Sequence, residues 1–152
     1  MAPPPDTPAA GVWRVAVDVG GTFTDCLARS PAGELRRAKA LSSGVLRLRA
    51  QSDGEPTRLR LDPSAPIALL AGARVTPTGA ASAAGAAIVM DAHPAEGLIA
   101  LDRQIPLETD RATIDVSTGE PAPILAARLA TATPADRPLP PMRLRIATTR
   151  AT

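Results

Sequence analysis

The sequence predicts an α/β protein of the strand-rich α+β type, with an opening antiparallel β-meander and one clear helix. Most segments alternate apolar and polar side chains with the two-residue period of strands that have one buried face. Turns that contain glycine or proline separate these segments at short intervals. Only residues 121–131 show the spacing of an amphipathic helix. The 152 residues suit one folded domain, which we place at 12–152.

The chain is expected to open with three antiparallel strands. The first strand covers 13–19, and its alternating apolar residues are Trp13, Val15, Val17 and Val19. Gly20-Gly21 interrupts the alternation and predicts a tight turn into a returning strand over 22–28. A turn at 31–33 leads to a third strand over 35–41. Residues 1–11 are rich in proline, so we expect a disordered tail there.

The middle of the chain predicts further short strands, at 45–50, 57–61, 67–75, 86–91 and 97–101. Leucine and arginine alternate in the first two, which we expect to pair as a hairpin across Ser52-Asp53-Gly54. Residues 76–87 are rich in small side chains and fit either a loop or a weak helix. The helix over 121–131 starts with a proline and ends before a proline-rich linker to a final strand over 142–147.

Composition argues against several functional classes. Cys26 is the only cysteine, which excludes an internal disulfide and a cysteine-cluster metal site, and we expect it in a strand core. The longest apolar stretch, Ile67–Ala73, is far shorter than the roughly 20 residues that cross a bilayer. All cations except Lys39 are arginines, spread among acidic residues without aromatic platforms for bases. We therefore expect a cytoplasmic protein that binds neither membrane nor nucleic acid.

The segment Asp18–Asp25 carries the clearest chemical pattern, Asp-Val-Gly-Gly-Thr-Phe-Thr-Asp. Gly20 and Gly21 allow a turn with positive φ, in which backbone amides approach phosphate oxygens closely. The hydroxyls of Thr22 and Thr24 add hydrogen-bond donors to such an anion site. An ordinary β-hairpin uses the same glycine pair, so these two residues alone do not distinguish the two interpretations.

The two acidic residues at the ends of this segment are candidate metal-site residues. Asp18 ends the first strand, where its carboxylate can hold Mg²⁺ directly or through water. Mg²⁺ prefers few carboxylates and several waters, so one or two aspartates suffice. Asp25 is a candidate to orient a water or a second polar group beside the metal. The segment as a whole predicts a site for a magnesium–nucleoside triphosphate.

Two segments carry a resemblance to a known family. The string Asp18–Asp25 resembles the first phosphate motif of the hydantoinase/oxoprolinase family. Thr148-Thr149-Arg150-Ala151-Thr152 resembles the opening of a Thr-Thr-x-x-Thr-Asn stretch that follows a strand in the same family. Weaker similarities lie at 39–44 and 117–120. The last motif stops before its asparagine, so we expect a truncated N-terminal region of such a protein.

This resemblance implies an incomplete N-terminal lobe of the RNase H-like, actin-like ATPase fold. It implies that ATP phosphorylates the carbonyl oxygen of a cyclic amide, after which water opens the ring. Mg²⁺ is the implied metal, and the implied partners are the missing C-terminal lobe and a second hydantoinase-type subunit. The implied nucleotide-binding residues are Gly20, Gly21, Thr22, Thr24, Thr148 and Thr149, with Asp18 and Asp25 at the metal.

Two alternative functions remain open. The chain also fits a fragment of a sugar-kinase-like phosphotransferase that shares only the phosphate turn. A small, non-catalytic binding module is the second alternative. In the hydrolase interpretation, the chain is expected to be inactive by itself, because it supplies only one wall of the nucleotide site.

Overall fold

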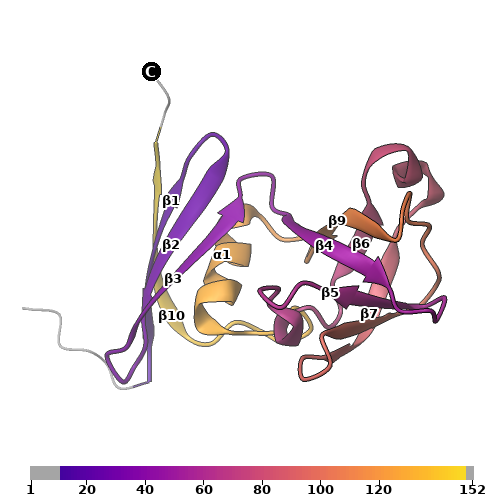
Figure 1. Cartoon of the computed structure of the whole chain (residues 1–152). Helices are drawn as coiled ribbons and strands as arrows, with labels where there is room; N and C mark the ends of the chain where they lie inside the picture. The colour runs from indigo at the N-terminus through magenta and orange to yellow at the C-terminus, as the bar shows by residue number, and fades with distance from the viewer. Residues whose placement is uncertain (1–10, 150–152) are drawn as a thin grey trace, which may run out of the picture.

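The structure is a computed structural model, and it describes residues 11–149. Within this range the chain forms ten strands, one α-helix and two short 3₁₀ helices, which confirms the strand-rich α+β class. The strands divide into a four-stranded sheet and a closed six-stranded barrel (Figure 1). The tail expected at 1–11 and the motif residues 150–152 fall almost entirely outside the described range.

The four-stranded sheet has the order β10-β1-β2-β3. Its strands are β1 (Trp13–Val19), β2 (Phe23–Arg29), β3 (Leu35–Leu41) and β10 (Met142–Thr148). The first three are antiparallel neighbours, so the predicted meander is confirmed. In contrast, β10 runs parallel to β1. The carboxyl ends of β1 and β10 therefore lie at the same edge of the sheet, next to the turn between β1 and β2.

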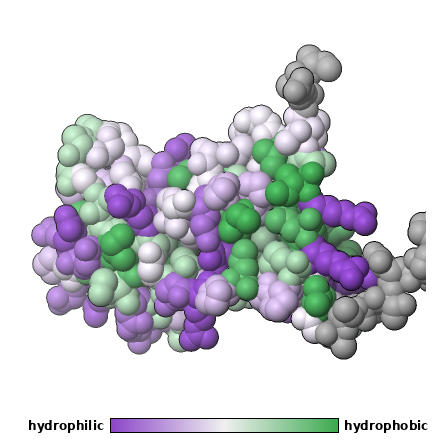
Figure 2. Space-filling model, turned by 180° about the vertical axis from the view of Figure 1, so that it is seen from behind, coloured by the Kyte–Doolittle hydropathy of each residue, from purple (hydrophilic) through white to green (hydrophobic). Residues whose placement is uncertain are grey.

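Helix α1 (Ala122–Thr131) covers one face of this sheet (Figure 1). The strands contribute mostly small side chains to the interface, and the helix contributes Leu125, Ala126, Ala127 and Ala130. The other face is uncovered by any described element, and it exposes Phe23, Leu27 and Leu35 by 40–54%. In the rear view, apolar side chains gather over the part of the surface formed by the sheet (Figure 2). This sheet consequently has one buried and one open face.

The closed barrel lies between β3 and α1 in the chain and has the strand order β4-β5-β8-β7-β6-β9. Its strands are β4 (Leu46–Ser52), β5 (Arg58–Leu61), β6 (Arg74–Pro77), β7 (Ala87–His93), β8 (Leu98–Leu101) and β9 (Arg111–Ser117). Its interior is apolar and well filled, with Val75, Val89, Ile99, Ile114 and Val116 at most 1% exposed. Leu46 packs against both this core and the core beneath α1, which joins the two parts.

Several predicted elements are confirmed, one predicted strand is wrong, and one strand was not predicted. The β4–β5 hairpin, the helix and the final strand form close to the predicted positions. The strand predicted at 67–75 is instead a 3₁₀ turn, η1 (Ile67–Leu69), followed by the short strand β6. An apolar run shows that residues are buried but does not distinguish a strand from a compact turn. A strand at β9 was not predicted, although its Ala112, Ile114 and Val116 alternate with polar residues.

The undecided segment 76–87 contains a second 3₁₀ helix, η2 (Gly79–Ala84), which comes before β7. It exposes most of its small side chains and buries none. Glu108 holds its first turn, because the carboxylate accepts hydrogen bonds from the amides of Ala80 and Ala81. Both alternatives considered for this segment were partly right, since it is a short helix within a loop.

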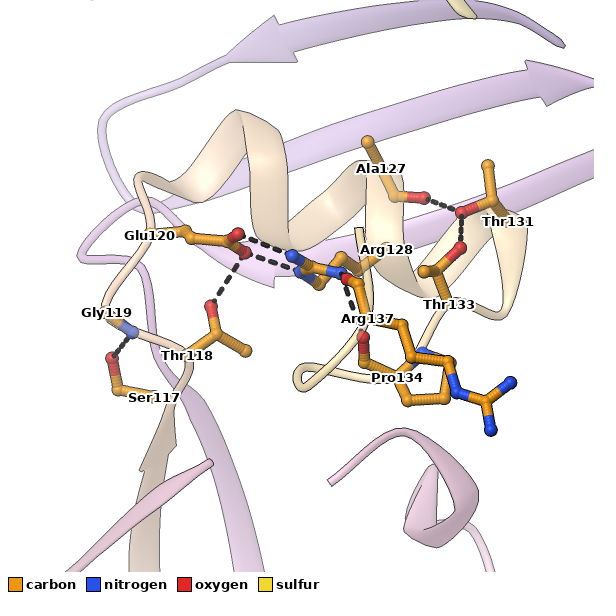
Figure 3. Close-up of polar contacts among 10 residues, drawn as sticks. All are labelled: Ser117, Thr118, Gly119, Glu120, Ala127, Arg128, Thr131, Thr133, Pro134 and Arg137. Carbon is orange, nitrogen blue, oxygen red and sulfur yellow. Dashed lines mark hydrogen bonds and ion pairs between the residues drawn. The ribbon is translucent and has the colours of Figure 1, made fainter. Parts of the chain in front are cut away.

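Arg128 on α1 fixes the chain that follows the helix (Figure 3). Its guanidinium donates two hydrogen bonds of 2.6 Å to the Glu120 carboxylate and two more to the carbonyls of Pro134 and Arg137. These bonds to Arg128 hold the pKa of Glu120 below its ordinary value. The Arg128 side chain is only 8% exposed. The linker that leads into β10 is thus anchored on the helix by one buried cation.

Among residues 11–149, no helix has both the length and the apolar character needed to span a membrane.

Candidate phosphate and metal site

The turn between β1 and β2 is closed by a hydrogen bond from the Gly20 amide to the Phe23 carbonyl oxygen, 2.9 Å long. Neither Gly20 nor Gly21 has the positive φ that we expected. Glycine is required at position 20 for another reason, since an added Cβ would lie 2.9 Å from the Phe23 carbonyl oxygen. At Gly21 an added Cβ would meet nothing within 4 Å. Close packing of the backbone, rather than unusual dihedrals, shapes this turn.

The tip of the turn presents unused hydrogen-bond donors. Within residues 11–149, the backbone amides of Gly21 and Thr22 donate to no other group. Both residues are exposed, and the Thr22 hydroxyl has no partner in the same part of the chain. Consecutive free amides at an exposed turn are groups that bind anions in proteins.

Thr24 occupies a different position from the one expected. It is fully buried, and its hydroxyl lies 3.0 Å from the Ser42 hydroxyl. Ser42 in turn donates a 2.7 Å hydrogen bond to the Gly20 carbonyl, and its amide donates to the Thr22 carbonyl. A direct contact between the Thr24 hydroxyl and a phosphate is excluded by this burial. Instead, the Thr24 hydroxyl contacts Ser42, which binds the Gly20 carbonyl in the turn. Thr24 is therefore a positioning residue.

Ser42 was not identified as a site residue from the sequence. It follows β3 and reaches the turn only because β3 lies beside β2 in the sheet. The one available signal was the weak family similarity at 39–44, which contains it.

Asp18 and Asp25 face each other directly across β1 and β2 on the open face of the sheet. Like charges in directly opposed positions repel each other and destabilise a sheet. Two neighbours reduce this repulsion: Lys39 lies 3.7 Å from the Asp25 carboxylate, and the Thr149 hydroxyl donates a 2.7 Å hydrogen bond to Asp18. An oxygen-binding cation between the two carboxylates would neutralise them further.

The end of β10 meets the β1–β2 turn as well. Thr148 lies opposite Val19 in the parallel ladder, and the Thr149 amide donates a 3.0 Å hydrogen bond to the Val19 carbonyl. Together with its hydroxyl bond to Asp18, Thr149 makes two contacts with the end of β1. The remaining residues of the predicted threonine motif, 150–152, lie outside the described range.

The donor set fits Mg²⁺ better than a transition metal. Within the described range, no group of three or more histidine, cysteine, aspartate or glutamate residues is arranged to hold a metal ion. Two exposed carboxylates leave most coordination positions for water and phosphate oxygens, as Mg²⁺ prefers.

No protein-family model, curated protein or solved structure matches this chain.

Cys26 lies in β2 close to this site, but its thiol is not a reactive group. It is buried beneath α1, and burial raises its pKa to about 11. Because the thiolate is the reacting species, we expect no modification of the native protein by a disulfide reagent such as DTNB at pH 7.5. The same assay in denaturant should release one equivalent of thiol per chain. Rapid labelling of the native protein would contradict this assignment.

Proposed function

We propose that the β1–β2 turn and the adjoining end of β10 bind the phosphates and metal of a magnesium–nucleoside triphosphate. One observation carries this proposal: Thr149 donates a hydrogen bond to Asp18, although the two residues are 131 positions apart. They belong to the two segments that resemble the hydantoinase/oxoprolinase family. A resemblance in two separate segments gains weight when both segments lie at one edge of a sheet.

Under this proposal, each residue at the turn has a distinct role. The free amides of Gly21 and Thr22 and the Thr22 hydroxyl approach phosphate oxygens. Asp18 holds Mg²⁺ directly or through water, and Asp25 orients a water beside it. Thr149 fixes the Asp18 carboxylate. Phosphoryl transfer depends mainly on such positioning and charge neutralisation, so this set of groups suits one wall of an ATPase site.

The wider proposal is an ATP-dependent cyclic-amide hydrolase of the hydantoinase/oxoprolinase type. The sheet supports it, because a meander followed by a helix and a parallel strand is the arrangement expected of an RNase H-like, actin-like lobe. The barrel is then an insertion between β3 and α1. A second lobe would supply the adenosine contacts, and a second hydantoinase-type subunit is the proposed partner. The chain alone provides phosphate and metal binding only.

The test uses Mn²⁺ and tripolyphosphate, which probe metal and phosphate binding without adenosine. Bound Mn²⁺ should broaden the NMR amide signals of Gly21 and Thr22 selectively. Asp18→Asn is expected to weaken Mn²⁺ binding at least about tenfold. Even the loss of a residue that only supports a metal ligand typically lowers metal affinity roughly 10- to 100-fold. Asp91→Asn is the matched control, because Asp91 is also an exposed strand aspartate but lies in the barrel.

Equal broadening in wild-type protein and Asp18→Asn would refute the metal assignment. Broadening centred on the barrel rather than the turn would refute the phosphate assignment.

A further inference from the structure

A hollow lies on the outside of the barrel, away from the β1–β2 turn and the end of β10. An open hollow of about 1000 Å³ covers the outer face of the neighbouring strands β9, β4 and β5. Its walls are formed by the segment 62–68, the 94–97 turn and residues 108–109. Hollows of this size hold small molecules in many proteins.

The floor of this hollow carries three arginines, Arg49, Arg60 and Arg111. The strand register places them close together. Arg49 lies opposite Thr113, whereas Gln51, two residues along β4, lies opposite both Arg111 on β9 and Arg60 on β5. Diagonal neighbours across a sheet lie roughly 7–8 Å apart, which is within reach of arginine side chains. The guanidinium groups can therefore converge on one ligand.

Two of these arginines have no counter-ion among the described residues. Arg60 bonds to Asp53 and to the Glu96 carbonyl, and the nearby Arg47 pairs with Asp115. In residues 11–149, no hydrogen bond or ion pair engages the guanidinium group of Arg49 or Arg111, although their backbone carbonyls accept hydrogen bonds from Asp62 and Thr109. Arg47 and Arg58, on the same strands β4 and β5, are ion-paired with Asp115 and Asp53, whereas Arg49 and Arg111 are available to a ligand.

Among residues 11–149, no acidic residue around the hollow forms an ion pair with Arg49 or Arg111. Glu108 is already engaged by the amides of Ala80 and Ala81 at η2. Asp62 and Glu96 also line the hollow. These carboxylates oppose the binding of an extended polyanion such as nucleic acid, which would contact them together with the arginines.

We propose that this hollow binds a small, doubly charged oxyanion, with Arg49 and Arg111 as its principal ligands. A guanidinium matches the oxygens of a phosphate or carboxylate through two parallel hydrogen bonds. Gln51 and Thr113, which lie beside the two arginines in the register, add neutral donors. The same chemistry is offered by a phosphate group and by a dicarboxylate.

The experiment titrates the full chain with inorganic phosphate and, separately, with succinate, at low ionic strength and without Mg²⁺. Binding is followed by calorimetry and by the NMR Nε–Hε signals of Arg49 and Arg111. Arg49→Gln and Arg111→Gln should each weaken binding about tenfold or more, because each removes charge-assisted hydrogen bonds to the ligand. Arg74→Gln is the matched control, since Arg74 is an exposed barrel arginine outside the hollow.

Binding of either probe that shifts both arginine signals and is lost in the two variants supports the proposal, and the preferred probe identifies the ligand class. If binding weakens equally in Arg74→Gln, the anion responds only to the net positive charge of the protein, and the proposed site is overturned. Failure of both probes to bind also overturns it.

Discussion

Replacing Arg128 with alanine is expected to lower the free energy of unfolding by about 3–5 kcal/mol, the cost of removing one partner from a buried ion pair. The side chain is 8% exposed and satisfies Glu120 together with the carbonyls of Pro134 and Arg137 (Figure 3). Truncation leaves a partly buried carboxylate and two carbonyls without their donor. Urea denaturation followed by Trp13 fluorescence measures the loss, because Trp13 packs against the core beneath α1.

Arg47→Ala is the control for this substitution. It removes an arginine that also makes two hydrogen bonds to a carboxylate, that of Asp115, but on the exposed surface. Exposed ion pairs contribute little to stability, so the unfolding midpoint should barely change. If Arg128→Ala and Arg47→Ala had equally small effects, the anchoring role of Arg128 would be disproved.

Ile114→Ala is expected to destabilise the barrel by about 2–5 kcal/mol, through lost burial and the cavity left behind. Ile114 is fully buried in β9, the strand that pairs with both β4 and β6 and so closes the barrel. Hydrogen exchange at the amides of Val75 and Val116 reports on this core. Their protection should fall by the same free energy as the global loss seen in urea.

Ile146→Ala provides the comparison for the core substitution. Ile146 lies in β10 and is 54% exposed, so its removal should cost about 1 kcal/mol or less. A loss at Ile114 no larger than the loss at Ile146 would show that β9 does not form part of a packed barrel.

The sequence determined the local elements wherever periodicity was strong. The meander over 13–41, the β4–β5 hairpin and α1 follow from alternation, glycine turns and helical spacing, which act over a few residues. It also located the chemical groups of the candidate site, because Asp18–Asp25 and the terminal threonines stand out as motifs. The strand predicted over η1 is wrong, because an apolar run does not determine backbone conformation. Strand β9 was not predicted, although its apolar and polar residues alternate.

Only the tertiary structure decided how distant segments meet. Closure of six strands into a barrel depends on pairing between β4 and β9, which are far apart in the chain. Likewise, the parallel pairing of β10 with β1 brings Thr149 to Asp18, and the sheet brings Ser42 beneath the turn while burying Thr24. Local sequence patterns do not predict these contacts. Pairing between strands that are distant in sequence depends on burying the apolar side chains of both cores together.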